Sequence, residues 1–465
     1  MTTRDATDTE SWRGRRVVVL GMARSGRAVA RLLARHGARV RGTDEKDALA
    51  LGLDTGLLTA EGVELRLGGF RPEDLAGMEL AVTSPGIPKT APVLELALRL
   101  GIPVLSELEV AARFARAPMA AVTGTNGKST TVTVLGQLVE ALGKPAAVVG
   151  NVGRALSEEV ESVPAEGVLV VEVSSYQLED VETFHPRSAA LLNLAPDHLD
   201  RYDSLDHYLA TKVRIFARQG RVDTAVLPLG DARIDAAASD LSARLLRFGR
   251  GEVVDGVRIG DANLCWCERG SRHPILPLAE LSLQGPHNHE NFAAALCLLA
   301  GLGLDPLEPR VVEALRRARG LPHRLEPVGE VEGVSFVNDS KATNPDSLGV
   351  ALRAFPGPIV LIAGGRPKQS GYRELAPLVA ARVALVVLIG EAAPLLEEAW
   401  ADAGVPFHHG GTDFEAAVRG AWEAAKRLGA PVVLSPGCAS FDMFRDYEDR
   451  GDRFRALVRS WGGKG

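Results

Sequence analysis

The chain alternates between short apolar runs and amphipathic segments along most of its length. An apolar run bounded by glycine or proline predicts a buried strand, and apolar residues spaced three and four apart predict a helix. Strands that alternate with helices are typical of α/β domains, whose mostly parallel sheets bind ligands at the carboxyl ends of the strands. We therefore predict three α/β domains in series, at residues 1–106, 107–320 and 321–465.

The first domain is predicted to contain a β-α-β unit of the Rossmann type. We expect strands at residues 15–21, 39–44, 79–84 and 103–106, and helices at residues 27–36 and 94–100. The turn Gly21-Met22-Ala23-Arg24-Ser25-Gly26 resembles the dinucleotide fingerprint G-x-G-x-x-G, but Ala23 replaces the middle glycine. This favours another nucleotide or phosphate-bearing ligand over NAD(P), with a purely structural turn as the remaining alternative. Asp44 ends the second strand, where a carboxylate can bind a ribose hydroxyl.

The second domain begins with a predicted strand at residues 119–122 and a helix at residues 131–142, after a helix at residues 107–117. Between them lies Gly124-Thr125-Asn126-Gly127-Lys128-Ser129-Thr130. Glycines allow backbone N–H groups to converge on a phosphate, lysine reaches the β/γ-phosphates, and the serine hydroxyl binds Mg²⁺. In the usual phosphate-loop pattern G-x-x-x-x-G-K-[ST], Val122 occupies the first glycine position. Only the second half of that pattern is therefore present in this chain. An ordinary tight turn before a helix is the alternative.

The rest of the second domain continues the alternation, with a β-rich stretch at residues 245–267. Its other predicted strands are residues 146–149, 168–173, 188–194 and 224–229, and its helices are residues 204–218, 292–302 and 307–319. The third domain is predicted to have strands at residues 334–338, 358–363, 384–389 and 431–434, and helices at residues 372–381, 394–403, 414–428 and 446–461.

Several polar residues are candidates for the site, and for each there is an alternative in which it has no catalytic or binding role. Glu172 either holds Mg²⁺ opposite the phosphate loop or is a solvated strand end, and His198 is either a metal ligand or a turn histidine. Lys212 lies on a helix beside apolar residues, where a surface lysine is the default. Asp339 offers a carboxylate after a strand or else caps a helix, and Arg324 reaches a phosphate or forms a surface salt bridge.

Composition limits the classes of partner. The 465 residues are 46% hydrophobic and 24% charged, as in ordinary globular proteins, and the net charge of −6 argues against nucleic acid and anionic membranes as partners. Four scattered cysteines indicate a reducing compartment, and Cys265-Trp266-Cys267 lacks the second pair that a metal site needs. Residues 1–14 do not resemble a signal peptide, and no apolar run has membrane-spanning length, so we expect a cytoplasmic protein, acting as a monomer.

Taken together, seven motifs resemble those of the Mur ligase family, over nearly the whole chain. They are GTNGKST (Gly124–Thr130), EVSSYQLE (Glu172–Glu179), NLAPDHLDRY (Asn193–Tyr202), ATK (Ala210–Lys212), GPHNHEN (Gly285–Asn291), LPHR (Leu321–Arg324) and NDSKATN (Asn338–Asn344). Within the family, three further segments are similar to the member that adds D-glutamate: the GMARSG turn, SPGIP (Ser84–Pro88) and SPGCASFDMFRDYEDRG (Ser435–Gly451).

The resemblance implies an ATP-dependent amide ligase of peptidoglycan precursor synthesis. Its substrates would be UDP-N-acetylmuramoyl-L-alanine, D-glutamate and ATP, with Mg²⁺ as cofactor and an acyl phosphate as intermediate. The alternatives are a family member that adds a different amino acid, for which the region from Ser440 to Tyr447 discriminates, and a nucleotide-binding dehydrogenase or regulatory module.

The resemblance also implies roles for individual residues. Lys128 and Ser129 match the phosphate lysine and the Mg²⁺ hydroxyl, Glu172 and His198 match Mg²⁺ ligands, and Lys212 matches a carbamylated lysine that supports the metal. Asn291, Arg324 and Asp339 match ATP contacts, alongside the loop Gly124, Thr125, Asn126, Gly127, Lys128, Ser129 and Thr130. Substrate contacts are expected at Ser25, Asp44, Ser84, Gly86 and Asn151, and D-glutamate contacts at Thr343, Lys368, Ser440 and Tyr447. Tyr447 departs from an expected phenylalanine, and the segment Ala363–Lys368 differs in its middle.

Overall fold

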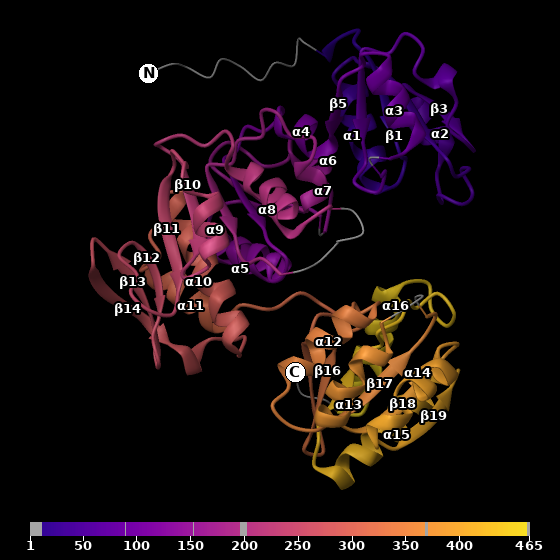
Figure 1. Cartoon of the computed structure of the whole chain (residues 1–465), viewed down its shortest axis with the longest axis vertical. Coiled ribbons are helices and arrows are strands. Elements are labelled where there is room, and N and C mark those ends of the chain that lie inside the picture. Colours follow the sequence, from indigo (N-terminus) through magenta and orange to yellow (C-terminus); the bar gives the residue numbers. More distant parts are fainter. Residues whose placement is uncertain (1–11, 89, 152, 196–201, 368–370, 463–465) are drawn as a thin grey trace. The chain divides into compact units, whose positions relative to one another are not determined.

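The computed structural model describes residues 12–88, 90–151, 153–195, 202–367 and 371–462, without the side chain of Asp346 (Figure 1). The described residues form three sheets of five, nine and six strands, each flanked by helices. The chain divides into two compact units, Met1–Arg319 with the first two sheets and Gly320–Gly465 with the third. The predicted architecture of three α/β domains is therefore confirmed, and the residue boundaries of the domains remain a prediction.

The first sheet is entirely parallel and has the strand order β3-β2-β1-β4-β5. Its strands are β1 (Arg16–Leu20), β2 (Arg39–Asp44), β3 (Val63–Leu67), β4 (Leu80–Thr83) and β5 (Val104–Ser106). The helices are α1 (Arg24–Arg35), α2 (Thr55–Ala60) and α3 (Pro92–Arg99), with a 3₁₀ turn at Pro72–Asp74. The pattern between residues 45 and 78 did not predict α2 or β3, because both are short and mixed in polarity.

Helix α1 begins three residues earlier than predicted, so Arg24, Ser25 and Gly26 form its first turn. Ala23 is the extended residue before the helix. A Cβ atom on Gly26 would lie 1.8 Å from the carbonyl oxygen of Gly21, so only glycine allows the helix to begin this close to the strand. Gly26, the last glycine of the fingerprint, therefore allows close packing of the helix against the strand, as in other turns of this type.

The second sheet has the order β14-β13-β12-β11-β10-β9-β6-β8-β7. The strands from β12 to β7 in this order pair in parallel, and β12, β13 and β14 form an antiparallel end. The strands are β6 (Met119–Thr123), β7 (Ala146–Gly150), β8 (Val168–Glu172), β9 (Ser188–Leu191), β10 (Thr224–Pro228), β11 (Arg244–Gly249), β12 (Gly256–Ile259), β13 (Asn263–Glu268) and β14 (Ser271–Pro277). Neighbouring strands β9, β6 and β8 end at the same edge, which brings the segments that follow them together.

Two long helices, α5 and α10, pack against each other and against this sheet. The helices of this part are α4 (Glu107–Ala112), α5 (Lys128–Ala141), α6 (Leu156–Glu159), α7 (Ser175–Leu178), α8 (Leu205–Val213), α9 (Ala232–Ala237), α10 (Pro286–Gly301) and α11 (Pro309–Arg317), with 3₁₀ turns at Arg214–Phe216 and Leu278–Glu280. Helix α5 starts at Lys128 rather than at Thr131, because Gly127 caps it with φ +83°, a conformation that favours glycine. The predicted helices at residues 107–117 and 204–218 are shorter in the structure.

The third sheet has the order β15-β16-β20-β17-β18-β19, antiparallel only between β15 and β16. Its strands are β15 (Glu326–Val331), β16 (Val334–Asn338), β17 (Ile359–Gly364), β18 (Val383–Ile389), β19 (Phe407–Gly411) and β20 (Val432–Leu434). The helices are α12 (Pro345–Ala354), α13 (Ala376–Arg382), α14 (Ala393–Ala399), α15 (Phe414–Leu428) and α16 (Tyr447–Ser460), with 3₁₀ turns at Arg373–Leu375 and Ala401–Ala403. The pattern did not predict β15, β19 or α12.

Within the first compact unit, one hydrophobic core continues from the first sheet into the second. Trp12 stacks on Phe114 with ring centroids 5.7 Å apart. The backbone N–H of Ser106 donates to the carbonyl of Asp180, so the last strand of the first sheet is attached to the loop after α7. Among the helices that the structure describes, we find none with the length and apolar character needed to span a bilayer.

Glu109 is a buried anchor at this junction. Its carboxylate accepts hydrogen bonds from the backbone N–H groups of Glu182, Thr183 and Phe184, from the Thr183 hydroxyl, and from Arg113. Burial raises the pKa of Glu109, but the bonds from Thr183, Glu182 and Arg113 outweigh it and hold the pKa below its usual value. The carboxylate thus binds the loop before β9 to α4.

Replacing Glu109 with alanine is expected to lower the free energy of unfolding by about 3–5 kcal/mol, because several buried donors lose their acceptor. Since the folded-state pKa is lowered, this contribution is present above the unfolded pKa and is lost as pH falls. Urea unfolding at pH 7 and over a series of lower pH values that extends below the lowered pKa of Glu109 measures both effects. The exposed Glu140→Ala serves as the control and should change stability by less than about 0.5 kcal/mol; an equal loss in both variants would contradict the prediction.

Candidate functional site

The phosphate loop connects β6 to α5 in a conformation that depends on its two glycines. Gly124 has φ +148° and Gly127 has φ +83°, both in the region that side chains rarely adopt. A Cβ atom on Gly127 would lie 2.3 Å from Oδ1 of Asn291, and one on Gly124 would lie 3.1 Å from Cβ of Leu192. The loop therefore has no room for side chains at these positions, and the N-terminus of α5 offers its backbone N–H groups to an anion.

Asn193 holds the loop from the segment after β9, a contact that the sequence did not predict. Its Oδ1 accepts from the backbone N–H of Asn126 at 2.9 Å, and its Nδ2 donates to the carbonyl of Asn126 at 3.1 Å. Thr125 exchanges two hydrogen bonds with the backbone of Ala195. Asn193 is the first residue of the motif NLAPDHLDRY, so the sequence marked it as a candidate. The sequence did not indicate that its partner is Asn126.

Lys128 lies over the loop. Its Nζ donates to the carbonyl oxygens of Gly124 and Thr125, each at 2.8 Å. Ser129, the next residue of the helix, is 1% exposed. The Lys128 ammonium group thus lies over the turn, and Ser129 is buried in the first turn of the helix that follows it.

Glu172 ends β8 beside this loop, because the register pairs Glu172 with Val122 of β6. The side chain is 1% exposed. Its Oε1 accepts from Nδ2 of Asn151 at 2.8 Å, whereas Oε2 is buried and finds no partner among the described residues. A buried carboxylate oxygen without a donor fits a cation as its partner, because an unsatisfied charged group is costly.

Lys212 approaches the same loop from α8. It is 1% exposed, and Tyr208, Leu209 and Phe216 around it are also buried. Its Nζ donates to the carbonyl of Gly124 at 2.8 Å and lies 4.3 Å from the centroid of the Tyr208 ring. Lys212 and Lys128 therefore share one carbonyl acceptor, and the surface-lysine alternative is wrong.

The structure brings the three described metal candidates, Ser129, Glu172 and Lys212, to the phosphate loop. His198, the fourth, lies outside the described residues. Within the part of the chain that the structure describes, no three His, Cys, Asp or Glu side chains come together as a metal site. The described set supplies one carboxylate, one hydroxyl and one lysine. Oxygen groups of this kind suit Mg²⁺, which is bound by one or two carboxylates together with phosphates.

Asn291 reaches the loop from the first half of α10, where it is 6% exposed. Its Oδ1 accepts from the hydroxyl of Thr131 at 3.3 Å. The amide therefore borders the phosphate loop, although the sequence places it 160 residues away.

In the first sheet, the predicted substrate residues gather at the carboxyl ends of β1, β2 and β4. The carboxylate of Asp44 accepts from the backbone N–H groups of Met22 at 2.6 Å and Lys46 at 2.9 Å. The hydroxyl of Ser84 donates to the carbonyl of Gly21 at 2.7 Å. Ser25 lies in the first turn of α1, and Gly86 is exposed in the loop after β4. Asp44 and Ser84 thus brace the turn in which an anion would bind.

In the second compact unit, Asp339 follows β16 and is 7% exposed. Its carboxylate accepts from the Ser435 hydroxyl at 2.7 Å and from the backbone N–H of Leu325 at 3.1 Å. Burial raises the pKa of Asp339 to about 7, although the Ser435 bond and the positive charge of Arg324 oppose this shift. Arg324 is exposed, one residue before Leu325. The helix-cap alternative for Asp339 is wrong, because the cap of α12 is Asn344.

Arg450 is a buried arginine that sequence reasoning missed. The side chain is 0% exposed and donates to the hydroxyl and carbonyl of Ser340 and to the carbonyl of Cys438. Burial lowers the pKa of Arg450 to about 10, so it stays protonated at neutral pH. It lies in the motif SPGCASFDMFRDYEDRG, but nothing in the pattern distinguishes it from the neighbouring exposed arginines. Arg450 joins the segment after β16 to the segment after β20.

Three of the four predicted D-glutamate residues, Thr343, Ser440 and Tyr447, lie on these joined segments. The Ser340 hydroxyl donates to the carbonyl of Tyr447, and the ammonium of Lys341 lies 5.4 Å from the centroid of the Tyr447 ring. Arg366 and Ala439 exchange two backbone hydrogen bonds, which places the segment before Lys368 beside the segment before Ser440. Ser440 is 2% exposed and Thr343 is half-buried. Lys368 itself lies outside the described residues.

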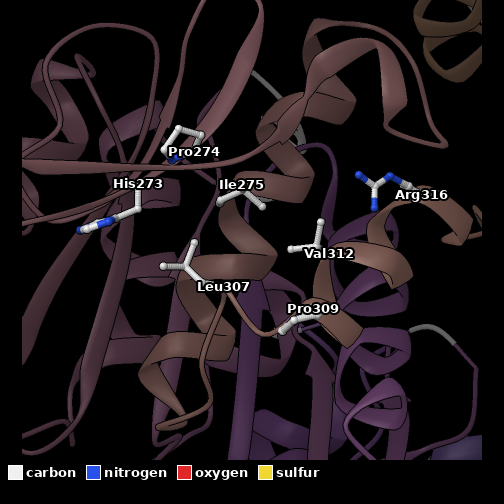
Figure 2. Close-up of a pocket in the computed structure, with 7 residues that line it drawn as sticks. All are labelled: His273, Pro274, Ile275, Leu307, Pro309, Val312 and Arg316. Atoms are coloured by element: carbon white, nitrogen blue, oxygen red, sulfur yellow. The ribbon is translucent and has the colours of Figure 1, made fainter.

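Two cavities in the described residues contain none of the predicted site residues. One of about 500 Å³ lies beside β14 and α11, lined by His273, Pro274, Ile275, Leu307, Pro309, Val312 and Arg316 (Figure 2). Figure 2 shows a mainly apolar wall with Arg316 at one end and His273 at the other. The second, of about 550 Å³, lies between the start of α15 and α16. The residues with matching chemistry therefore gather at strand ends and not in the two cavities.

Three family models match the chain in succession. The N-terminal domain of MurD-like Mur ligases matches residues 15–106, the Mur ligase middle domain matches residues 122–299, and the Mur ligase glutamate ligase domain matches residues 323–438. Solved structures with the same fold include MurC of Thermotoga maritima, with 18% identity, 96% of this chain and 99% of that chain covered, and a TM-score of 0.58. A second is MurF of Acinetobacter baumannii, with 19% identity, 96% of this chain and 93% of that chain covered, and a TM-score of 0.59.

Curated relatives are similar over almost their full lengths. The UDP-N-acetylmuramoylalanine--D-glutamate ligase of Pelotomaculum thermopropionicum is 42% identical, with 96% of this chain and 98% of the relative covered. The enzyme of the same name from Anaeromyxobacter dehalogenans is 44% identical, again with 96% and 98% covered. The resemblance seen in the seven motifs is confirmed, and the chain belongs to the Mur ligase family.

Proposed function

We propose that this protein is an ATP-dependent amide ligase that adds D-glutamate to UDP-N-acetylmuramoyl-L-alanine during synthesis of the peptidoglycan precursor. The observation that carries the proposal is the similarity of 41–44% identity, over 96% of the chain, to relatives that have this activity in their names. The phosphate loop, with two lysines and a buried glutamate beside it, supports the same chemistry. The dehydrogenase alternative is not favoured.

The reaction transfers the γ-phosphoryl group of ATP to the carboxylate of the alanyl substrate, which releases ADP and forms an acyl phosphate. The amine of D-glutamate then attacks the carbonyl carbon. The amine loses its proton, and inorganic phosphate leaves from the tetrahedral intermediate. Chemistry of this kind depends mainly on positioning and on neutralising charge, because the protein forms no covalent bond with the substrate.

The chain's own groups supply that neutralisation. We propose that the N–H groups at the start of α5 hold the phosphates and that Lys128 exchanges its two carbonyl partners for phosphate oxygens. Its ammonium then balances the charge that develops on the transferred group. Asn291, Arg324 and Asp339 are proposed as further contacts to ATP.

The donor set around Glu172 fits Mg²⁺. We propose that Ser129, Glu172 and His198 hold the metal together with Lys212 in its carbamylated form, which has two oxygens in place of an ammonium. Bound Mg²⁺ neutralises phosphate charge during the transfer. Asn151 orients Glu172 through its hydrogen bond to Oε1 and is also proposed to contact the muramoyl substrate.

The two substrates are proposed to bind at different sheets. Ser25, Asp44, Ser84 and Gly86 would bind the uridine diphosphate part of the muramoyl substrate at the first sheet. Thr343, Lys368, Ser440 and Tyr447 would bind D-glutamate at the third sheet. Arg450 is proposed to act indirectly, because it holds the segments that carry these residues. We expect the enzyme to act as a monomer.

Release of inorganic phosphate by the purified protein tests the proposal. Phosphate should appear only when ATP, UDP-N-acetylmuramoyl-L-alanine and D-glutamate are all present, because the acyl phosphate forms on one substrate and is consumed by the other. Replacing D-glutamate in turn with L-glutamate, L-lysine, meso-diaminopimelate and L-alanine tests the amino-acid assignment. Equal turnover with another amino acid would reject D-glutamate as the substrate, and no turnover with any of them would reject the ligase.

A further inference from the structure

One residue after β9, Asn193, binds most of the backbone between the two loop glycines. Its Oδ1 accepts from the N–H of Asn126 at 2.9 Å, and its Nδ2 donates to the carbonyl of Asn126 at 3.1 Å. Its backbone carbonyl accepts from the N–H of Thr125 at 3.2 Å. Asn193 therefore binds three of the four backbone polar groups of Thr125 and Asn126.

The bonds to Asn193 decide which N–H groups of the loop can bind an anion. In phosphate loops, backbone N–H groups converge on the phosphates. The N–H groups of Thr125 and Asn126 are bonded to Asn193 instead, so they are not available to a phosphate. The donors for a phosphate must therefore come from the residues after Asn126, at the N-terminus of α5.

The loop carbonyls bear on whether these donors stay open. In an α-helix the N–H of residue i bonds to the carbonyl of residue i−4, so the carbonyls of residues 124–126 would satisfy the N–H groups of residues 128–130. Helix α5 begins at Lys128, and the N–H of Thr131 bonds to the carbonyl of the capping glycine at 2.9 Å. Side chains bind the three earlier carbonyls: Lys128 binds the first two and Asn193 the third.

We propose that Asn193 is a positioning residue of the phosphate loop, which keeps the N-terminus of α5 open for the phosphates of the nucleotide. Its Nδ2 binds the carbonyl of Asn126, which would otherwise be within the helical pattern of the Thr130 N–H. The inference rests on the proposed function, in which the anion is the phosphate chain of ATP. All of the groups involved belong to the first compact unit.

The expected effect of losing the Asn193 amide is a lower affinity for nucleotide. The freed carbonyl of Asn126 can then accept from Thr130, which extends α5 by one residue and removes an N–H donor from the anion site. When only a fraction of the molecules has the open loop, the apparent dissociation constant rises by the inverse of that fraction. Loss of two partly exposed hydrogen bonds should lower the fraction by about threefold to tenfold.

Three variants of the full-length protein separate positioning from general stability. Asn193→Leu has a similar size and removes both side-chain bonds, whereas Asn193→Asp keeps an acceptor for the Asn126 N–H and loses the donor to its carbonyl. Gln219→Met is the matched control. Gln219 also binds backbone of separate segments, the carbonyls of Pro186 and Thr224, but at the opposite end of β9 from Asn193.

The first measurement is hydrogen–deuterium exchange at single amides of the ligand-free protein. In Asn193→Leu the amide of Asn126 should exchange about tenfold faster, and that of Thr130 should exchange more slowly, because it gains an acceptor. In Asn193→Asp only Thr130 should change, and in Gln219→Met neither amide should change. General loosening of the loop would speed both amides, so faster exchange at both, or no change at either, would overturn the proposal.

The second measurement is calorimetry with ADP and Mg²⁺ as the probe. A Kd about threefold to tenfold higher in Asn193→Leu, with no change in Gln219→Met, supports the proposal. An unchanged Kd in Asn193→Leu, or an unsubstituted protein that does not bind ADP, would overturn it. If the unsubstituted protein binds ADP but releases no phosphate with all three substrates, the proposed function fails, and the Kd values of the variants still decide the role of Asn193.

Discussion

Replacing Lys128 with alanine is expected to lower the rate of phosphate release by on the order of 10²–10³-fold, the usual effect of removing one charge-stabilising contact to the transition state. The Nζ atom lies 2.8 Å from the carbonyl oxygens of Gly124 and Thr125, in the mouth of the anion-binding turn. Without a ligand the Lys128 ammonium stabilises the loop by its hydrogen bonds to these carbonyls. With ATP bound it would hydrogen-bond to the phosphate oxygens instead. Phosphate release with all three substrates measures the effect.

The control for Lys128→Ala is Lys144→Ala, at a lysine just beyond the other end of α5 whose Nζ donates to the backbone carbonyl of Glu166 at 3.3 Å. Lys144→Ala should keep nearly full activity. Thermal unfolding should show both variants folded, because the carbonyl of Gly124 keeps its hydrogen bond from Lys212 and Thr125 is only half-buried. Near-normal turnover of folded Lys128→Ala would reject the phosphate-loop assignment.

Replacing Lys212 with alanine is expected to abolish activity, and a short carboxylic acid in the medium is expected to restore part of it. An ammonium offers only donors and is a poor ligand for Mg²⁺, which prefers oxygen. Carbamylation of the amine supplies two oxygens and a negative charge. The side chain is 1% exposed and lies over the Tyr208 ring, so its removal leaves an enclosed space beside the loop. Acetate or propionate is expected to occupy this space and to take the place of the carbamate.

The rescue separates the proposed role of Lys212 from a structural one. Lys128→Ala should not respond to added acid, because it lacks a cation and not a carboxylate. Phosphate release at increasing acetate concentration, with chloride at the same ionic strength as the control, measures the difference. If Lys212→Ala retains most of its activity without acid, or if acetate activates both variants equally, the carbamate assignment is wrong.

The sequence by itself determined many of the local elements and singled out the candidate phosphate loop. The strands Arg39–Asp44 and Val334–Asn338 and the helix Phe414–Leu428 lie where the pattern predicts them. In Val334–Asn338 the apolar residues Val334 and Phe336 lie two positions apart, and Phe414–Leu428 has apolar residues at helical spacing, so these signals come from residues close in sequence. The loop was recognisable for the same reason, because its glycines and its lysine are consecutive.

Only the tertiary structure decided which of the candidate residues meet. The order β9-β6-β8 places Glu172 beside Val122, and the approach of α8 places Nζ of Lys212 on the carbonyl of Gly124, 88 residues away. Arg450 and Gln137 look like surface residues in the sequence, but one is buried by the segments after two strands and the other binds Arg319. Strand order and these contacts arise from burial of apolar faces and from satisfying buried polar groups between distant segments. A local pattern contains no information on which distant segment will supply the partner.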